Sequence, residues 1–236
     1  MWNGAPWSCA IVDPGRRTRP TGLSLKEGAS LGVNAFADLV VAFGRDDPPR
    51  STRLGNPWTR VETGPGSVWT SRGSRLPGTT AAGEPVSVGS WTVWAVGEVF
   101  AYHGVEVDPL RRFVGDLEGG TADPSGLDAH AVLFGWDVEQ RCLHVWTDRM
   151  GTVHAYRGGA PGGASVGTYS PAVAEVSTGS LDWVGITGFC GFGFYPADRT
   201  HLEDVRVLRP ATWSVFDERG ALRSEHRYWD WTHDRA

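Results

Sequence analysis

The side chains that could act as nucleophiles or metal ligands are few and widely spaced in this sequence. The cysteines are Cys9, Cys142 and Cys190, an odd set without paired spacing, so we expect no disulfide framework. Cys142 and His144 fall on one face of a strand-like run, where a thiolate and an imidazole could share a metal ion. No C-x-x-C or H-x-x-x-H spacing accompanies them, so we predict neither a metal site nor a cofactor.

The elements that position these residues are clearest over residues 131–156. Two apolar runs, 131–137 and 142–147, flank a polar turn at 138–140. Both are rich in β-branched and aromatic residues and apolar on both faces, which predicts an antiparallel hairpin buried on both sides. Such a sheet needs a packing layer on each face. The break at 148–151 predicts a second tight turn, after which 152–157 runs back as a third strand.

Other elements are indicated along the chain. Residues 67–71 and 90–100 are typical of strands, whereas 33–43 fits either a strand or a short helix. Residues 106–117 predict a helix with Asp108 as N-cap, Pro109 at the first helical position and one apolar face. Residues 45–65 are dense in Pro, Gly and charge, which indicates a surface loop.

The hairpin pattern W-D-x(5)-L-x-V-x-x-D-R-x-G-x-x-x-x-Y resembles the class II glutamine amidotransferase domain of asparagine synthetases and β-lactam synthetases. The order that follows is also similar: a short helix after Tyr169-Ser170, a helix over 181–192, T-x-x-x-x-V-x-x-L-x-P over 200–210, and a closing Tyr228-Trp229. The resemblance is strongest over residues 91–231. It implies an α+β fold, a four-layer αββα sandwich of mostly antiparallel sheets as in Ntn hydrolases, with residues 1–236 as a single amidotransferase-like domain.

The resemblance gives Cys9 a possible catalytic role. In that family an N-terminal cysteine supplies the thiol that attacks glutamine and the α-amine that takes the proton, and Cys9-Ala10-Ile11-Val12 resembles that start. Eight residues precede Cys9, and the bulky Trp2 disfavours removal of Met1. Cys9 is therefore expected either to be a buried residue of a first strand or to become catalytic after processing.

The resemblance also places the family's N-G-E strand end at Val96, Gly97 and Glu98. In the family the Asn side chain and the Gly backbone form the oxyanion hole. Val96 has no side-chain donor, and loss of one such donor costs roughly 100- to 1000-fold in rate. Gly97 and Glu98 remain candidate substrate-binding residues, although Glu98 is better explained as a turn residue or a partner of an arginine.

Two other parts of the family's site are weak or missing here. The interval before residue 131 is too short for the family's S-D-x-E helix, so Asp123 and Asp128 are expected to be loop residues. Asp148, Arg149 and Gly151 of the D-R-x-G turn are expected to hold that turn and its neighbouring loop. The S-G-G-x-D-S signature with which asparagine synthetases bind ATP does not occur in the 236 residues.

Composition narrows the classes of partner. The formal net charge of −5 and the absence of a basic stripe argue against nucleic-acid binding. No apolar run approaches the roughly 20 residues of a membrane span, and the N-terminus does not resemble a signal peptide. With its unpaired cysteines, the chain is expected in the cytoplasm, with no contact with a membrane.

We therefore expect a catalytically silent amidotransferase-like domain. It would dock onto a separate ATP-dependent synthetase subunit or a biosynthetic substrate, as the degenerate N-terminal domain of β-lactam synthetases accompanies its active partner. Tyr228, Trp229 and Trp231 are expected either to form the contact surface or to pack under the last strand. The alternatives are a glutamine-hydrolysing amidotransferase activated by removal of residues 1–8 to free Cys9, and a hydrolase with a displaced site. The oligomeric state is not indicated.

Overall fold

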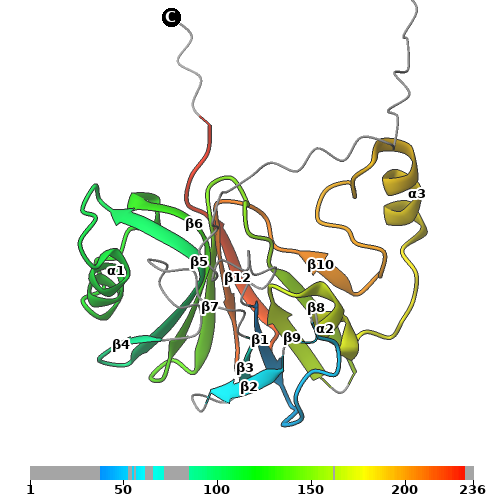
Figure 1. Cartoon of the computed structure of the whole chain (residues 1–236), viewed down its shortest axis with the longest axis horizontal. Helices are drawn as coiled ribbons and strands as arrows, with labels where there is room; N and C mark the ends of the chain where they lie inside the picture. The colour runs from blue at the N-terminus through cyan, green and yellow to red at the C-terminus, as the bar shows by residue number, and fades with distance from the viewer. Residues whose placement is uncertain are drawn as a thin grey trace, which may run out of the picture. The chain divides into compact units, whose positions relative to one another are not determined.

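The computed structural model describes residues 38–52, 55, 57–61, 66–71, 85–161 and 163–231, all within the unit that begins at Val33. These residues form two six-stranded sheets, A and B, whose strand pairs are all antiparallel (Figure 1). Sheet A has the order β10 (Val205–Val207), β8 (Tyr156–Ala160), β9 (Gly163–Gly167), β1 (Asp38–Phe43), β3 (Ser67–Ser71) and β2 (Trp58–Val61). Sheet B has the order β12 (Leu222–Arg227), β11 (Thr212–Phe216), β7 (Cys142–Thr147), β6 (Leu127–Asp137), β5 (Trp91–Tyr102) and β4 (Val86–Val88).

One hydrophobic cluster is shared by the two sheets. Successive side chains of a strand point to opposite faces, and alternate residues of β5, β6 and β7 pack against β1, β3 and β9. Full burial of an aliphatic or aromatic side chain contributes roughly 1.5–3 kcal/mol, so this contact is a major source of stability. The buried members of this inter-sheet cluster are Leu39, Val41, Phe43, Val68, Trp94, Val96, Val132, Phe134, Trp136, Leu143, Val145, Ala155, Val166, Leu208 and Phe216.

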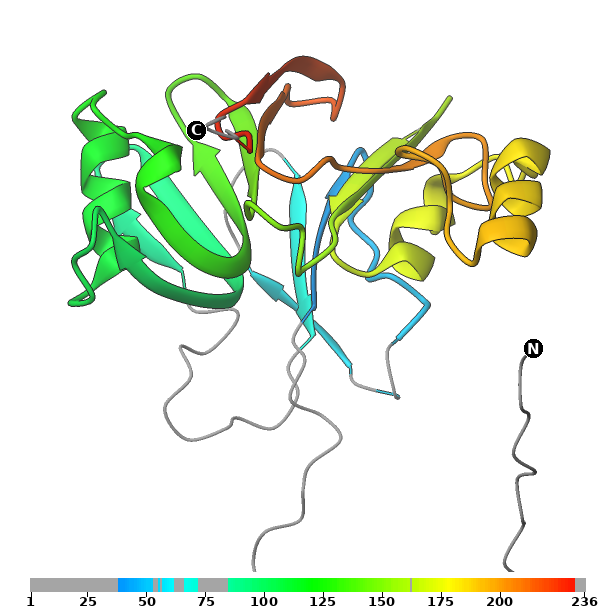
Figure 2. The ribbon, with the colours of Figure 1, turned by 90° about the horizontal axis from the view of Figure 1, so that it is seen from above.

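Helices pack against the remaining faces of both sheets. The helix α1 (Pro109–Glu118) buries Leu110, Phe113 and Val114 against sheet B. The short α2 (Ser170–Val173) and the 3-10 turn η2 (Ala174–Val176) pack on sheet A, where the Ser165 hydroxyl donates to the carbonyl of Val173 at 2.9 Å. Figure 2 shows from above how these helices lie beside the sheets. The other helices are η1 (Pro124–Gly126) and α3 (Trp183–Phe192), and no described helix is long and apolar enough to cross a membrane.

The predicted central hairpin is confirmed. Strands β6 and β7 pair in the register Val132 opposite Thr147 through Asp137 opposite Cys142, and both faces of β7 are buried. The predicted helix is also confirmed, although the side chain of its N-cap residue, Asp108, makes no capping hydrogen bond. The ambiguous segment is a strand over its described part, β1.

The predicted third strand is wrong in both its start and its sheet. It begins at Tyr156, not at residue 152, and pairs with β9 and β10 in sheet A. The reason lies in the preceding turn, where the Asp148 carboxylate accepts from the backbone N–H groups of Met150, Thr152 and Val153. Those donors are therefore unavailable for pairing with β7, and the chain crosses to the other sheet.

His144 on β7 is a buried titratable group among aromatic rings. The Nε1–H of Trp213 donates to His144 Nδ1 at 3.0 Å, so the neutral ring carries its hydrogen on Nε2. The ring of Trp91 stands edge-on at 4.7 Å and that of Trp146 stacks at 5.7 Å between centroids. Burial lowers the pKa of His144 to about 4, although the nearby Asp137 charge opposes the shift.

Protonation of His144 should destabilise the fold. The unfolded chain takes up this proton near pH 6.5 and the folded chain near pH 4, so the unfolded state binds more protons between these values. The free energy of unfolding therefore falls as the pH is lowered through this window, by about 3 kcal/mol in total. Chemical denaturation across the window should show this slope in the native chain.

The matching variant is His144→Phe. It loses the Trp213 hydrogen bond and so is less stable above pH 6.5, but the slope between pH 6.5 and pH 4 should become shallower. His226→Phe, a change on the exposed strand β12, serves as the control. Equal slopes for the His144 and His226 variants would show that another group dominates the acid response.

Candidate functional site

The residues that the resemblance assigns to an oxyanion hole lie in the middle of β5 and not at a strand end, because β5 continues to Tyr102. Val96 is 5% exposed and belongs to the inter-sheet cluster, so its side chain contributes packing and no hydrogen-bond donor. Gly97 has φ +112°, and a Cβ there would lie 2.2 Å from the carbonyl oxygen of His130. The close approach of β6 therefore requires glycine at this position. Shortly beyond it the β5–β6 register shifts between Val99 and Ala101.

Glu98, the second candidate substrate-binding residue, is an exposed residue of β5. Its cross-strand neighbour is His130, whose ring packs edge-on against Phe100 at 5.2 Å between centroids. Within the described residues the Glu98 carboxylate makes no hydrogen bond and no ion pair, so it has no arginine partner there. An exposed, unpaired carboxylate is an acceptor for a ligand but supplies no nucleophile.

The D-R-x-G turn is directed into the fold. The Asp148 carboxylate is buried and accepts four hydrogen bonds, from Met150, Val153 and two groups of Thr152, between 2.7 and 3.2 Å. Gly151 has φ +65°, and a Cβ there would lie 2.8 Å from Pro210 Cγ. These contacts fasten the turn to the segment that precedes β11.

Arg149 of the same turn connects two distant segments. Its guanidinium donates to the carbonyl of Ser125 at 2.6 Å, and its Cζ lies 5.9 Å from the centre of the Trp229 ring. The guanidinium thus binds two groups of the protein itself, a backbone carbonyl and an aromatic ring, which is a structural role.

The described part of β1, an inner strand of sheet A, does not begin with a cysteine. β1 begins with Asp38, a buried carboxylate that accepts from the Thr168 hydroxyl at 3.1 Å. The same hydroxyl accepts from the Leu39 N–H at 3.1 Å. Cys9 and the strand expected around it lie outside the described residues.

The described cysteines are poorly placed for nucleophilic chemistry. The thiol of Cys142 donates to the carbonyl of Gln140 at 3.3 Å and accepts from Arg223 at 3.2 Å. Burial raises the pKa of this thiol, opposed by the Arg223 charge, and the protonated form is a weak nucleophile. Cys190 is exposed on α3. Among the described residues, no group of three or more His, Cys, Asp and Glu side chains could hold a metal ion.

The helix α3 exposes a large apolar surface, which sequence reasoning missed. Its ten residues contain no charge, and a helix that is apolar all round is ordinarily buried. Here the buried residues of α3 are Gly185 and Gly188, while six large apolar side chains in and around the helix expose between 43% and 72% of their surface. This α3 patch comprises Leu181, Trp183, Val184, Phe189, Phe192 and Phe194.

The two glycines bring α3 close to the chain that follows it. A Cβ on Gly185 would lie 2.2 Å from the carbonyl oxygen of Thr200, and one on Gly188 would lie 2.5 Å from Pro196 Cδ. Larger residues would not fit on this face. The aromatic side chains of α3 are therefore directed to its other sides, where Phe189 stacks on Tyr195 at 4.9 Å between centroids.

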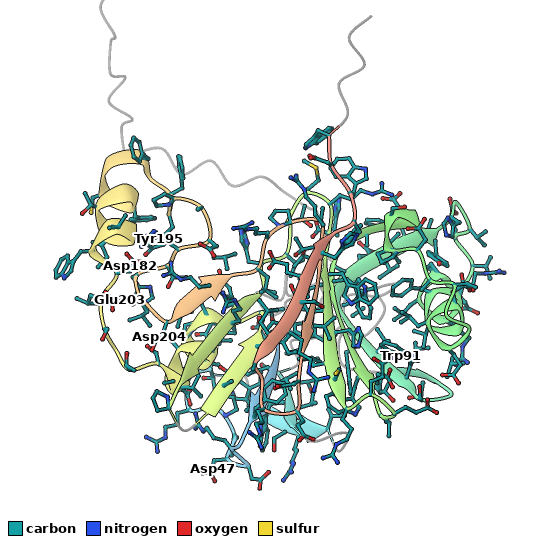
Figure 3. All side chains as sticks on the ribbon, turned by 180° about the vertical axis from the view of Figure 1, so that it is seen from behind. Asp47, Trp91, Asp182, Tyr195, Glu203 and Asp204 are labelled. Atoms are coloured by element: carbon teal, nitrogen blue, oxygen red, sulfur yellow. The ribbon has the colours of Figure 1, made fainter. Side chains whose placement is uncertain are left out.

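Asp182 fixes the start of α3 (Figure 3). It is 3% exposed and accepts from the Gly185 N–H at 2.9 Å, as an N-cap residue does. Arg199 NH1 lies 2.7 and 2.8 Å from its two oxygens, and Arg206 NH1 lies at 3.4 Å. The hydrogen bond from Gly185, together with the two arginines, lowers the pKa of the Asp182 carboxyl.

The C-terminal aromatics are divided between packing and exposure. The Tyr228 hydroxyl donates to the carbonyl of Thr147, and burial raises its pKa above the ordinary value. The Trp229 ring is half-buried and meets Trp231 edge-on at 4.9 Å between centroids. Trp231 is the most exposed of the three, at 59%. These residues thus present a smaller apolar surface than the α3 patch.

Comparison with known proteins returns no matching family model and no matching curated protein. Among solved structures the chain is similar to a glutamine phosphoribosylpyrophosphate (PRPP) amidotransferase from B. subtilis, complexed with ADP and GMP, at 12% identity and a TM-score of 0.43. The match covers 83% of this chain and 43% of that chain, so this chain spans less than half of its length.

Replacing Asp182 should loosen α3. Asp182→Ala removes the cap and both arginine contacts, which together should lower the free energy of unfolding by about 2–3 kcal/mol. Amide hydrogen exchange should increase more in α3 than in the rest of the described structure, relative to the unmodified chain. The control is Glu203→Ala, an exposed carboxylate nearby (Figure 3), which should change stability by less than about 0.5 kcal/mol. Uniform loss of protection, with α3 no more affected than sheet B, would contradict this role.

Proposed function

We propose that this chain is an amidotransferase-like domain that binds a partner protein and does not itself hydrolyse glutamine. The contacts of α1 with sheet B, of the two sheets with each other, and of α2 with sheet A fit the four-layer αββα sandwich that the resemblance implies. The proposal of the amidotransferase class rests on the hairpin motif, its D-R-x-G turn and the order of elements after it. One fold hosts many chemistries, so the function has to be derived from the site.

The observation that carries the absence of catalysis is the burial of Val96. At the position where the resemblance expects an asparagine, an apolar side chain packs into the inter-sheet cluster. A tetrahedral intermediate bound beside Gly97 would lack that side-chain donor, a deficit worth roughly 100- to 1000-fold in rate. The buried thiol of Cys142, with its raised pKa, does not replace the missing nucleophile.

The intact chain should therefore release no ammonia from glutamine above the buffer rate. The assay is run on the complete chain, on a form that begins at Cys9, and on the Cys9→Ala variant, with intact-mass measurement to establish each N-terminus. The form beginning at Cys9 should also remain inactive, since Val96 is unchanged. Ammonia release by that form, abolished by Cys9→Ala, would instead support the processed amidotransferase as the function.

The α3 patch supports a docking role. Exposed apolar patches of several hundred Å² mark interaction sites, and aromatic side chains cover about 150–250 Å² each. The four aromatic residues of the patch, roughly half to three-quarters exposed, together expose about half to three-quarters of the roughly 800 Å² that one partner contributes to a standard interface. The helix bears no charge, so the complementary surface is an uncharged apolar groove. We assign that groove to a separate ATP-dependent, amide-forming synthetase subunit in a biosynthetic pathway.

The docking role predicts unequal effects of two tryptophans. With purified proteins, Trp183→Ser should weaken binding to the proposed synthetase subunit by about 30-fold, the usual cost of removing a buried interface tryptophan. Trp231→Ser, an equally exposed residue near the C-terminus, should have little effect. Equal losses would place the interface at the C-terminal aromatics as well.

Size-exclusion chromatography of the chain alone provides the decisive control. A dimer that depends on concentration and is abolished by Trp183→Ser would mean that a second copy covers the α3 patch. That result would overturn docking onto a synthetase.

A further inference from the structure

A cavity of about 380 Å³ opens where β1 ends and β8 turns into β9, beside η2. Its volume lies within the range of roughly 300–1,000 Å³ typical of small-molecule sites. None of its described walls belongs to the α3 patch or to the Val96–Glu98 part of β5, so it is separate from the surfaces described above. The walls are Arg45 and Arg50 from the loop after β1, Pro161 and Gly163 from the β8–β9 turn, and Glu175 and Val176 from η2.

The lining carries more positive than negative charge. Arg45 lies 3.6 Å from Glu175 Oε2, an ion pair without a hydrogen bond. Arg50 makes no hydrogen bond or ion pair with any described residue. The nearby carboxylate of Asp46 is engaged by Arg60 at 3.2 Å, so it does not compensate Arg50. In a chain of net charge −5, an unpaired arginine at a cavity favours an anionic ligand.

Glu175 contributes an acceptor that lacks a donor. Its Oε1 accepts from the Ser51 N–H at 2.7 Å. Its Oε2 is buried and has no hydrogen-bond partner among the described residues. A buried acceptor without a donor costs about 1–3 kcal/mol, and a hydroxyl or amino group in the cavity would satisfy it.

The cavity is held open by fixed backbone. Next to Arg50, the carbonyl of Ser51 accepts from Trp58 Nε1 at 2.8 Å and that of Thr52 accepts from the Tyr169 hydroxyl at 3.2 Å. On the opposite wall, Gly163 has no side chain. A Cβ at this position would lie 3.7 Å from Val176 Cγ1 and 4.0 Å from Arg45 Cδ, so a larger side chain would fill the cavity.

We propose that this cavity binds a small carboxylate that also carries a hydroxyl or amino donor. The carboxylate of the ligand binds Arg50 and Arg45, and its donor binds Glu175 Oε2. Each group of the ligand thus meets a protein group that the fold leaves without a hydrogen-bond partner among the described residues. Two charged contacts on a preformed wall limit the ordering that binding requires.

The experiment is isothermal titration of the complete chain with L-malate, succinate and inorganic phosphate. Malate and succinate differ by one hydroxyl, so their ratio of affinities measures the contact with Glu175. We expect malate to bind about 10-fold or more tightly than succinate, as a hydrogen bond to a charged acceptor provides. No binding of malate overturns the proposal. Phosphate binding as tightly as malate would show a simple anion site and would overturn the role of Glu175.

Variants assign the contacts. Arg50→Gln should weaken malate binding about 10-fold or more, whereas Arg111→Gln removes the same charge at an exposed residue of α1, away from the cavity, and should leave it unchanged. Glu175→Gln should reduce malate affinity toward that of succinate. Gly163→Val should abolish binding of both while circular dichroism shows an intact fold. Equal losses in the Arg50 and Arg111 variants, or full binding by the Gly163 variant, would contradict a site in this cavity.

Discussion

The structure depends on the burial of both faces of β5, β6 and β7. Because successive residues of these strands point to opposite sides, one set of apolar side chains meets β1 and the other meets α1. A single packing layer could cover only one of the two sets. The chain therefore needs a second sheet, whose strand β1 lies far away in sequence. Within that sheet, β1 is joined to the residue after β9 by the hydrogen bond from Leu39 N–H to Thr168 Oγ1, 129 residues apart.

The same alternation along β5 places the side chain of Val96 in the interior. Val96 follows Trp94 on the inner face, and both side chains belong to the inter-sheet cluster. A polar amide at position 96 would face apolar neighbours. At the next residue, Gly97, β6 approaches too closely for any side chain. Position 96 therefore serves the packing between the sheets, and its side chain offers no hydrogen-bond donor.

Close approach by glycine also explains where the apolar surface lies. Gly185 and Gly188 let α3 press its backbone against Thr200 and Pro196, and Asp182 locks the start of the helix through Gly185, Arg199 and Arg206. The helix is therefore rigidly attached through a face without side chains. Its aromatic residues project from the remaining faces, which makes a well-positioned apolar surface out of a sequence that would ordinarily form a core.

The sequence alone determined the local elements: the β6–β7 hairpin, α1, and the strands β3 and β5 follow from short-range alternation or from helical spacing. It also supplied the turn residues Asp148 and Gly151 and the valine at position 96. Tertiary structure alone decided that β8 joins sheet A, that α3 is exposed, and that Arg45, Arg50 and Glu175 meet at one cavity. The physical reason is range. Periodicity records which way neighbouring side chains point, whereas these three outcomes depend on contacts between segments whose approach no local pattern encodes.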